Sequence, residues 1–259
     1  MMGSLPLPLE RTILPLLRSV GAFFILSVQA VSRIFRFPFP YREWIRQVDR
    51  IGVGSLFIIV LTGLFTGMII ALLGLNLLRP YAAVGSVGGM VAVTMVKELG
   101  PVLAALMVAG RVGAAITAEL GTMVVTEQVD AMAVEGTDVI QRLVTTRLLA
   151  TVLAMPLLTQ ITNGIALLGG FFMATSYQVN ATMYWQSLTL FLNYSHLLEG
   201  FIKPLIFGFI IAMVGCHLGL STQRGAEGVG DAAKRAVVIS SVLILMTDFF
   251  IAKIFLVVG

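Results

Sequence analysis

Long apolar segments alternate with short polar connections along most of the chain. The apolar runs lie at about 52–77, 84–122, 142–174, 199–220 and 236–257. Each reaches or exceeds the roughly 20 residues that a helix needs to cross a bilayer. They lack the two-residue alternation of barrel strands, and hydrocarbon offers backbone polar groups no water partner. The pattern predicts an all-α, polytopic membrane protein with five transmembrane helices.

The first fifty residues differ from the rest. The prolines of Phe37-Pro38-Phe39-Pro40 break any helix. We expect residues 1–50 to form an interfacial region with an amphipathic elbow helix, and residues 51–259 to form the transmembrane domain. Arg11 and Arg18 before an apolar run also fit a cleavable signal peptide, but five arginines follow between residues 33 and 50. Exporting them would oppose the positive-inside bias, so we expect the segment to be retained.

Basic residues alternate between the predicted connections. Seven Lys and Arg precede residue 51, the four connections carry one, two, none and three, and the pI is near 9.5. This bias predicts a cytoplasmic N-terminus and a periplasmic C-terminus, and it explains the basic pI without nucleic-acid binding. In the uncharged connection, Tyr184-Trp185 fits a short periplasmic helix at the membrane interface or a simple aromatic anchoring belt.

The second apolar run contains ionisable residues in Lys97-Glu98-Leu99-Gly100-Pro101, at Arg111 and at Glu119, although the mean hydropathy of the chain is +0.98. A charge at bilayer depth costs at least about 2.5 kcal/mol, so such residues face protein or a wet cavity. They either contact a ligand or neutralise one another, Lys97 with Glu98 or Asp248 and Arg111 with Glu119. Gly100-Pro101 predicts a kink, a tilt or an extension of this long run.

The connection between the second and third spans predicts a short helix over about 126–136. Thr126 is suited to cap it and Gly136 to end it. With Val129, Met132 and Ala133 on one face, it is shaped to dock a soluble partner, a solvated linker being the alternative. A second helix follows, since Asp138 and Gln141 have the spacing of a capping box.

Several kinds of site are missing from the sequence. The chain has no Gly-x-x-x-x-Gly-Lys-Ser/Thr loop, so any ATP would be hydrolysed elsewhere. Cys216 is the single cysteine, and neither His196 nor His217 has the spacing of a zinc site. The glycine-rich segment 225–230 is expected to form a flexible turn. We therefore expect no cofactor on this chain.

The segments Lys97-Glu98-Leu99-Gly100-Pro101, Ala109-Gly110-Arg111, Ala118-Glu119 and Thr126-Glu127-Gln128 together resemble the MlaE/YrbE family of permeases. The resemblance implies a non-catalytic permease subunit of an ABC-type transporter in the bacterial inner membrane. The transporter would move phospholipids between the inner and outer membranes, with the lipid in a cavity at a permease dimer interface. The implied partners are a second permease copy, a P-loop ATPase dimer that binds ATP and Mg, a periplasmic MlaD-like MCE-domain hexamer and a small STAS-domain protein.

The resemblance also assigns roles to residues. It implies contact with lipid for charged and apolar side chains of four spans and the first connection, namely Ile70, Leu77, Leu78, Tyr81, Lys97, Glu98, Leu99, Lys203 and Asp248. It implies contact with the ATPase for Glu127, Gln128 and Met132. Two rival functions remain. A secondary transporter with Glu98, Glu119 and Asp248 as a proton relay would work without an ATPase, and a membrane-embedded lipid enzyme would turn over product as the purified chain.

Overall fold

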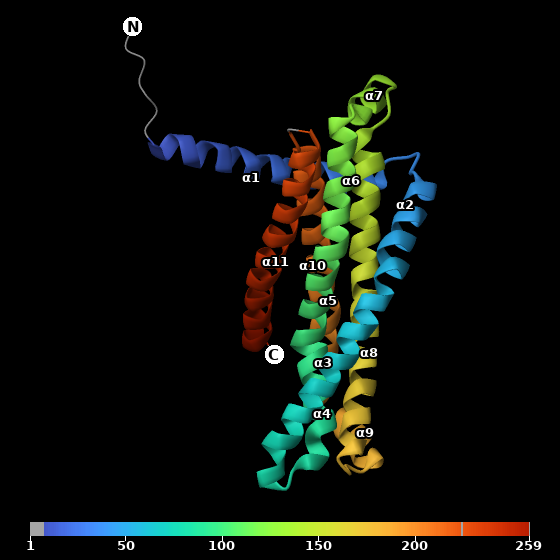
Figure 1. The fold of residues 1–259 in the computed structure, drawn as a ribbon, viewed down its shortest axis with the longest axis vertical. Coiled ribbons are helices and arrows are strands. Elements are labelled where there is room, and N and C mark those ends of the chain that lie inside the picture. The colour runs from blue at the N-terminus through green and yellow to red at the C-terminus, as the bar shows by residue number, and fades with distance from the viewer. Residues whose placement is uncertain (1–7, 224, 259) are drawn as a thin grey trace.

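The computed structural model describes residues 8–223 and 225–258, and the regular structure in these ranges is helical (Figure 1). The α-helices are α1 (Pro8–Ser32), α2 (Tyr41–Val48), α3 (Gly54–Leu78), α4 (Val87–Thr94), α5 (Gly100–Val108), α6 (Ala114–Val125), α7 (Gln128–Val134), α8 (Thr146–Ser176), α9 (Ala181–Phe191), α10 (Tyr194–Leu220) and α11 (Gly225–Val258). The predicted all-α class is confirmed.

Wider π-helical turns join several of these helices into long rods. They lie at Asp49–Val53, Met95–Leu99, Ala109–Gly113 and Ile140–Thr145. The long second run is thereby continuous from Val84 to Val125. Two π-helical turns interrupt its α-helical geometry, one directly before Gly100-Pro101, where the sequence predicted a kink, and one at Arg111. Such turns are frequent at functional sites because they redirect side chains and backbone carbonyls.

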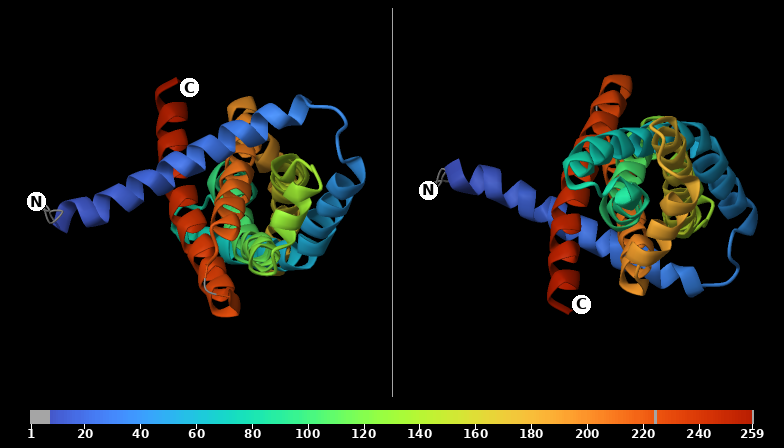
Figure 2. Two further views of the ribbon diagram at one scale, coloured as in Figure 1. Left: turned by 90° about the horizontal axis from the view of Figure 1, so that it is seen from above. Right: turned by 90° about the horizontal axis from the view of Figure 1, so that it is seen from below.

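Six helical segments of the described chain are long and apolar enough to cross a membrane, one more than the sequence predicted. The extra candidate is Leu17–Phe35 in α1. In Figure 1 α1 lies across the end of the bundle that also carries α7, whereas the other five run along the bundle. Figure 2 shows α1 extending well beyond the bundle. This orientation is the one that an interfacial elbow helix requires.

Close approach of α3 and α8 holds one side of the bundle together. Gly63 and Gly67 lie against the backbone of Thr162 and Ala166, and Gly169 lies against the carbonyl of Leu64. A methyl group at any of these glycines would collide with a backbone carbonyl oxygen. Small residues of this kind let helix backbones pack in contact within a membrane.

Two local predictions were wrong. Thr126 does not cap α7, because its hydroxyl donates to the carbonyl of Thr122, and Glu127 precedes the helix in the left-handed conformation (φ 58°). Residues 225–230 form the first turns of α11 rather than a flexible loop, so this helix begins well before the predicted residue 236. Gly136, with φ 76°, ends the short helix as predicted.

Asp138 fastens the connection after α7 to the segment after α1. Its carboxylate accepts hydrogen bonds from Arg33 Nε at 2.8 Å and Arg36 at 3.3 Å, and from the Gln141 N–H at 3.1 Å, as the capping-box spacing predicted. The Gln141 side chain donates to the carbonyl of Arg36 at 2.6 Å. Burial alone would raise the pKa of Asp138, but the Gln141 N–H and the two guanidinium groups outweigh it and lower the pKa.

We predict that Asp138→Asn lowers the melting temperature at neutral pH and that the deficit shrinks in acid. Because the folded pKa lies below the unfolded value, the stabilisation is complete above the unfolded pKa and is lost as the pH falls through the folded pKa. Thermal unfolding in detergent at about pH 7, 5 and 3 measures this. Glu135→Gln, at an exposed acid nearby, should show no such pH dependence. A deficit of equal size at all three pH values would contradict the prediction.

Candidate functional site

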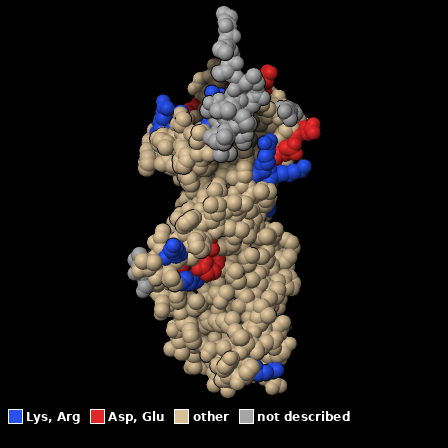
Figure 3. Space-filling view, turned by 90° about the vertical axis from the view of Figure 1, so that its left-hand side faces the viewer, with Lys and Arg blue, Asp and Glu red and all other residues tan. Residues whose placement is uncertain are grey.

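Charged residues from distant parts of the chain meet midway along the bundle. The mid-bundle charge cluster consists of Lys97 and Glu98 from the π-helical turn before α5, Glu199 and Lys203 one turn apart on α10, and Asp248 on α11. Figure 3 shows charged side chains of both signs midway along one face, surrounded by uncharged residues. An isolated charge would be costly at this depth, so the grouping is what makes the charges tolerable.

Lys203 is at the centre of the cluster, and its side chain has no exposed surface. Its ammonium nitrogen lies 2.6 Å from Glu98 Oε2, 3.0 Å from the carbonyl oxygen of Lys97 and 2.9 Å from Asp248 Oδ1. Three oxygen atoms thus surround a group that carries three protons. The arrangement ties α10 to both the second span and α11.

The carbonyl of Lys97 is free to accept from Lys203 for a reason visible in the sequence. Pro101 follows Lys97 by four residues and has no N–H, so it cannot make the usual helical hydrogen bond to that carbonyl. The same relation recurs at Pro204, where the carbonyl of Gly200 accepts instead from the Gln160 side chain at 3.2 Å. In both places a proline leaves a backbone carbonyl without its helical hydrogen bond, and a side chain from another helix donates to that carbonyl instead.

Glu199 joins the two lysines. Its Oε1 lies 3.5 Å from Lys97 Nζ and its Oε2 lies 4.0 Å from Lys203 Nζ, and its side chain is 3% exposed. Sequence reasoning missed this residue. The available signal was its i,i+4 spacing from Lys203, which places both on one face of a helix. With all groups ionised the cluster holds two positive and three negative charges, a formal sum of −1.

The exposed part of the cluster is formed mainly by Lys97 and Glu98. Lys97 and Glu98 expose 27% and 36% of their side chains, while Lys203 and Glu199 are buried behind them. The pairing differs from the predicted one, because Lys97 pairs with Glu199 rather than with Glu98 or Asp248. The open side presents one ammonium and one carboxylate to any ligand that carries charges of both signs.

The predicted apolar contacts divide into two groups. Ile70 is buried in the core between α3, α4 and α8, and Leu78 and Leu99 pack against that core. Leu77 and Tyr81 are instead exposed at the far end of α3, where the structure brings neither to the charges. Leu99 is therefore the predicted apolar residue that directly adjoins the charged turn.

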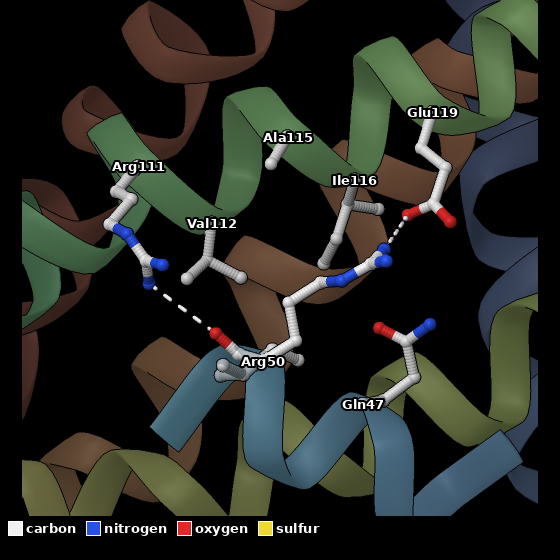
Figure 4. Close-up of a pocket in the computed structure, with 8 residues that line it drawn as sticks. Gln47, Arg50, Arg111, Val112, Ala115, Ile116 and Glu119 are labelled. Atoms are coloured by element: carbon white, nitrogen blue, oxygen red, sulfur yellow. Dashed lines mark hydrogen bonds and ion pairs between the residues drawn. The ribbon is translucent and has the colours of Figure 1, made fainter. Parts of the chain in front are cut away.

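A second polar group lies nearer the α7 end. Glu119 pairs with Arg50 at 2.9 Å and with Arg147 at 3.2 Å, so its predicted pairing with Arg111 was wrong. Arg111 donates to the Ser55 hydroxyl at 2.8 Å and to the carbonyl of Arg50 at 3.4 Å. Arg50, Arg111 and Glu119 line a cavity of about 460 Å³ between the π-helical turn after α2 and the second span (Figure 4).

The short helix α7 protrudes at the end of the bundle, and its outward face differs from the predicted one. Glu127 and Gln128 are exposed as expected, but Val129 and Met132 pack against the bundle core. Met132 is therefore only partly exposed, and its contact with a partner stays a prediction. Val134, 89% exposed, is the large apolar side chain that faces outward.

Comparison with known proteins identifies the family. The family model described as "Permease MlaE" matches residues 44–254. The chain belongs to the MlaE permease family. Relatives of this permease include a "Probable ABC transporter permease protein" of Rickettsia bellii, 40% identical over 95% of both chains. The "Intermembrane phospholipid transport system permease protein MlaE" of Haemophilus influenzae is 32% identical over 81% of both chains.

A plant relative extends the similarity. The protein "TRIGALACTOSYLDIACYLGLYCEROL 1, chloroplastic" of Arabidopsis thaliana is 35% identical over 89% of this chain and 66% of its own length. The chain is thus a multi-pass membrane protein of a transporter family. Within the described residues of this MlaE permease, no group of three His, Cys, Asp or Glu side chains is placed to hold a metal ion.

We predict that Lys203→Met is the most damaging single change in the cluster of this MlaE permease. It leaves three carboxylates beside Lys97 alone, and removing one partner of a buried ion pair costs about 3–5 kcal/mol. Glu199→Gln, which brings the formal charge sum to zero, should cost less, and the double variant should recover part of the loss. Chemical unfolding in detergent measures each effect.

The matched control is Arg46→Ala, which breaks an ion pair with Glu43 in which Arg46 is 75% exposed. An exposed pair contributes at most about 1 kcal/mol. If Lys203→Met were no more destabilising than this control, the cluster would not hold the helices together.

Proposed function

We propose that this chain is the permease subunit of an ATP-driven transporter that moves phospholipids between the inner and outer membranes. A lipid is held at the mid-bundle charge cluster, in a cavity shared with a second permease copy. ATP is bound with Mg and hydrolysed by a separate ATPase dimer, and this chain makes no covalent bond. The single observation that carries the proposal is a cluster of both charge signs, open on one side, in an otherwise apolar bundle.

The cluster suits a phospholipid for physical reasons. A head group brings a phosphate and often an ammonium, and the partly exposed Lys97 and Glu98 offer the opposite charges. Leu99, next to them, is half-buried against the apolar core, and its exposed part offers acyl chains an apolar contact. A lysine ammonium binds phosphate as a point charge, without the two parallel hydrogen bonds that an arginine guanidinium makes. Such contacts form and break without a fixed geometry.

The second span supports the coupling to ATP. One continuous helical rod, Val84–Val125, carries Lys97 and Glu98 in its first half and ends directly before α7. Glu119 on the same rod is held by Arg50 and Arg147 from two other elements. An ATPase that moved α7 would therefore move the charge cluster as well. ATP binding to the partner would in this way shift the equilibrium between two conformations of the lipid cavity.

The orientation follows from charge. We place the N-terminus, α1 and α7 on the cytoplasmic side of the inner membrane, and the C-terminus and α9 on the periplasmic side, since the connection that contains α9 has no Lys or Arg. An MlaD-like MCE-domain hexamer then docks at the α9 end. A small STAS-domain protein joins the assembly beside the ATPase.

We predict that Lys97→Gln or Glu98→Gln reduces lipid transport at least about tenfold, because each removes a charge-assisted contact with the head group. Transport of a labelled phospholipid between proteoliposomes that contain the purified complex measures this. Glu98→Gln keeps an oxygen atom for Lys203 and leaves it Asp248 and Glu199 as counter-charges, so both variants should still fold and retain the ATPase, whose content in each preparation is measured alongside. Lys234→Gln, at an 82% exposed lysine, should leave transport at the wild-type rate. Unchanged transport in both cluster variants would refute the lipid site.

We predict that Glu127→Lys with Asp130→Lys detaches the ATPase. Both residues are exposed on or beside α7, so reversing their charge places repulsion at the contact with the partner and leaves the bundle unaffected. Co-purification of the ATPase with the tagged permease measures the effect. Met132→Leu, which keeps the inward packing, serves as control and should retain the partner. An ATPase that stays bound to the charge-reversed variant at the wild-type ratio would show that α7 is not its docking site.

A further inference from the structure

A groove lies between α1 and α11, with α10 as its floor. Its apolar part has a volume of about 400 Å³ and is lined by Phe23 and Phe24 of α1, Val214 and Leu218 of α10, and Ile239 and Leu243 of α11. The two walls belong to elements that converge only near the α7 end of the bundle (Figures 1 and 2). The volume falls within the range of small-molecule sites.

The α1 wall is held in place by specific contacts with the floor. The hydroxyl of Ser19 lies 3.2 Å from His217 Nε2 in a hydrogen bond. The ring of Phe23 packs edge-on against the His217 ring, with centroids 5.9 Å apart. Because α1 is fixed to α10 in this way, the space between α1 and α11 is a preformed slot.

A polar cavity of about 640 Å³ adjoins the slot and shares Ser19 with it. Its lining includes Glu227, Asp231 and Arg235 from the first turns of α11. Asp231 also pairs with the largely exposed Lys234 at 3.5 Å. The groove therefore joins a shelf with both charge signs, at the first turns of α11, to an apolar slot between α1 and α11.

We propose that this groove binds a zwitterionic phospholipid from the membrane leaflet on the α7 side, at a site separate from the mid-bundle charge cluster. One acyl chain lies in the slot between Phe24 and Leu243. The head-group ammonium is held by Glu227 and Asp231, and the phosphate by Arg235. An apolar slot next to a shelf with both charge signs matches an amphiphile with a zwitterionic head group. An apolar helix from a partner protein would fill the slot but leave the charges of the shelf without partners.

The occupant would bridge α1 to α11, the helix that carries Asp248 of the cluster. The site depends on neither the direction of transport nor the presence of an ATPase. Its test therefore measures binding, so that failure here leaves the proposed function standing and failure of transport leaves this site standing.

The test uses the full-length chain, with the subunits that accompany it, in nanodiscs that contain a phosphatidylethanolamine with a photoactivatable acyl chain. After illumination and digestion, crosslinked peptides should concentrate on residues 19–24 and 239–243. Leu243→Trp fills the slot and should reduce this labelling about fivefold. A loss of this size corresponds to weaker binding of the acyl chain by about 1 kcal/mol. Val242→Trp, on the exposed face of the same turn, is the matched control and should leave labelling unchanged.

A second arm tests the head group. Glu227→Gln with Asp231→Asn should abolish the preference for phosphatidylethanolamine over phosphatidylglycerol in the same slot, because the ammonium loses its counter-charges. Labelling spread evenly over all apolar helix faces, or unaffected by Leu243→Trp, would overturn the site. Slot labelling that never distinguishes the two lipids, even in the unaltered chain, would overturn the zwitterionic assignment. Capture of a protein segment in place of lipid would overturn the proposal as a whole.

Discussion

The ammonium of Lys203, fully buried among apolar helices, is the constraint on which the rest of this structure depends. A buried cation persists only if oxygen atoms meet its protons, and here Glu98 and the carbonyl of Lys97 accept them while the Asp248 carboxylate lies 2.9 Å away as a further counter-charge. That carbonyl is free because Pro101 has no N–H to offer it. One side chain thereby sets the mutual depth and rotation of the second span, α10 and α11.

The same constraint explains how a charged site exists at bilayer depth. Glu199 and Lys203 form the buried part of the cluster, and Lys97 and Glu98 contact them with part of their own side chains exposed. The buried charges position the exposed ones, so the open side presents an ammonium and a carboxylate in fixed places. A phospholipid head group carries the complementary charges, which is the physical basis of the proposed transport function.

A single helical rod connects the α7 end of the molecule to this site. The helix from Val84 to Val125 contains the charged turn, carries Glu119 between two arginines, and leads into α7. Beyond α7, Asp138 ties the connection to the segment that follows α1. The interfacial helix, the short protruding helix and the charge cluster are thus mechanically linked by ion pairs and continuous backbone.

The sequence by itself determined the all-α class, the approximate position of the apolar spans and the short helix near residues 126–136, and its resemblance to a known family singled out Lys97, Glu98, Lys203 and Asp248 as candidate site residues. These follow from local patterns, namely hydropathy, helix punctuation and recognisable motifs. Only the tertiary structure decided that Lys97 pairs with Glu199, that Arg50 and Arg147 hold Glu119, and that Met132 turns inward. These outcomes depend on the rotation and depth at which distant helices pack, and because each helix could present a charge to several neighbours, no local pattern specifies which one it meets.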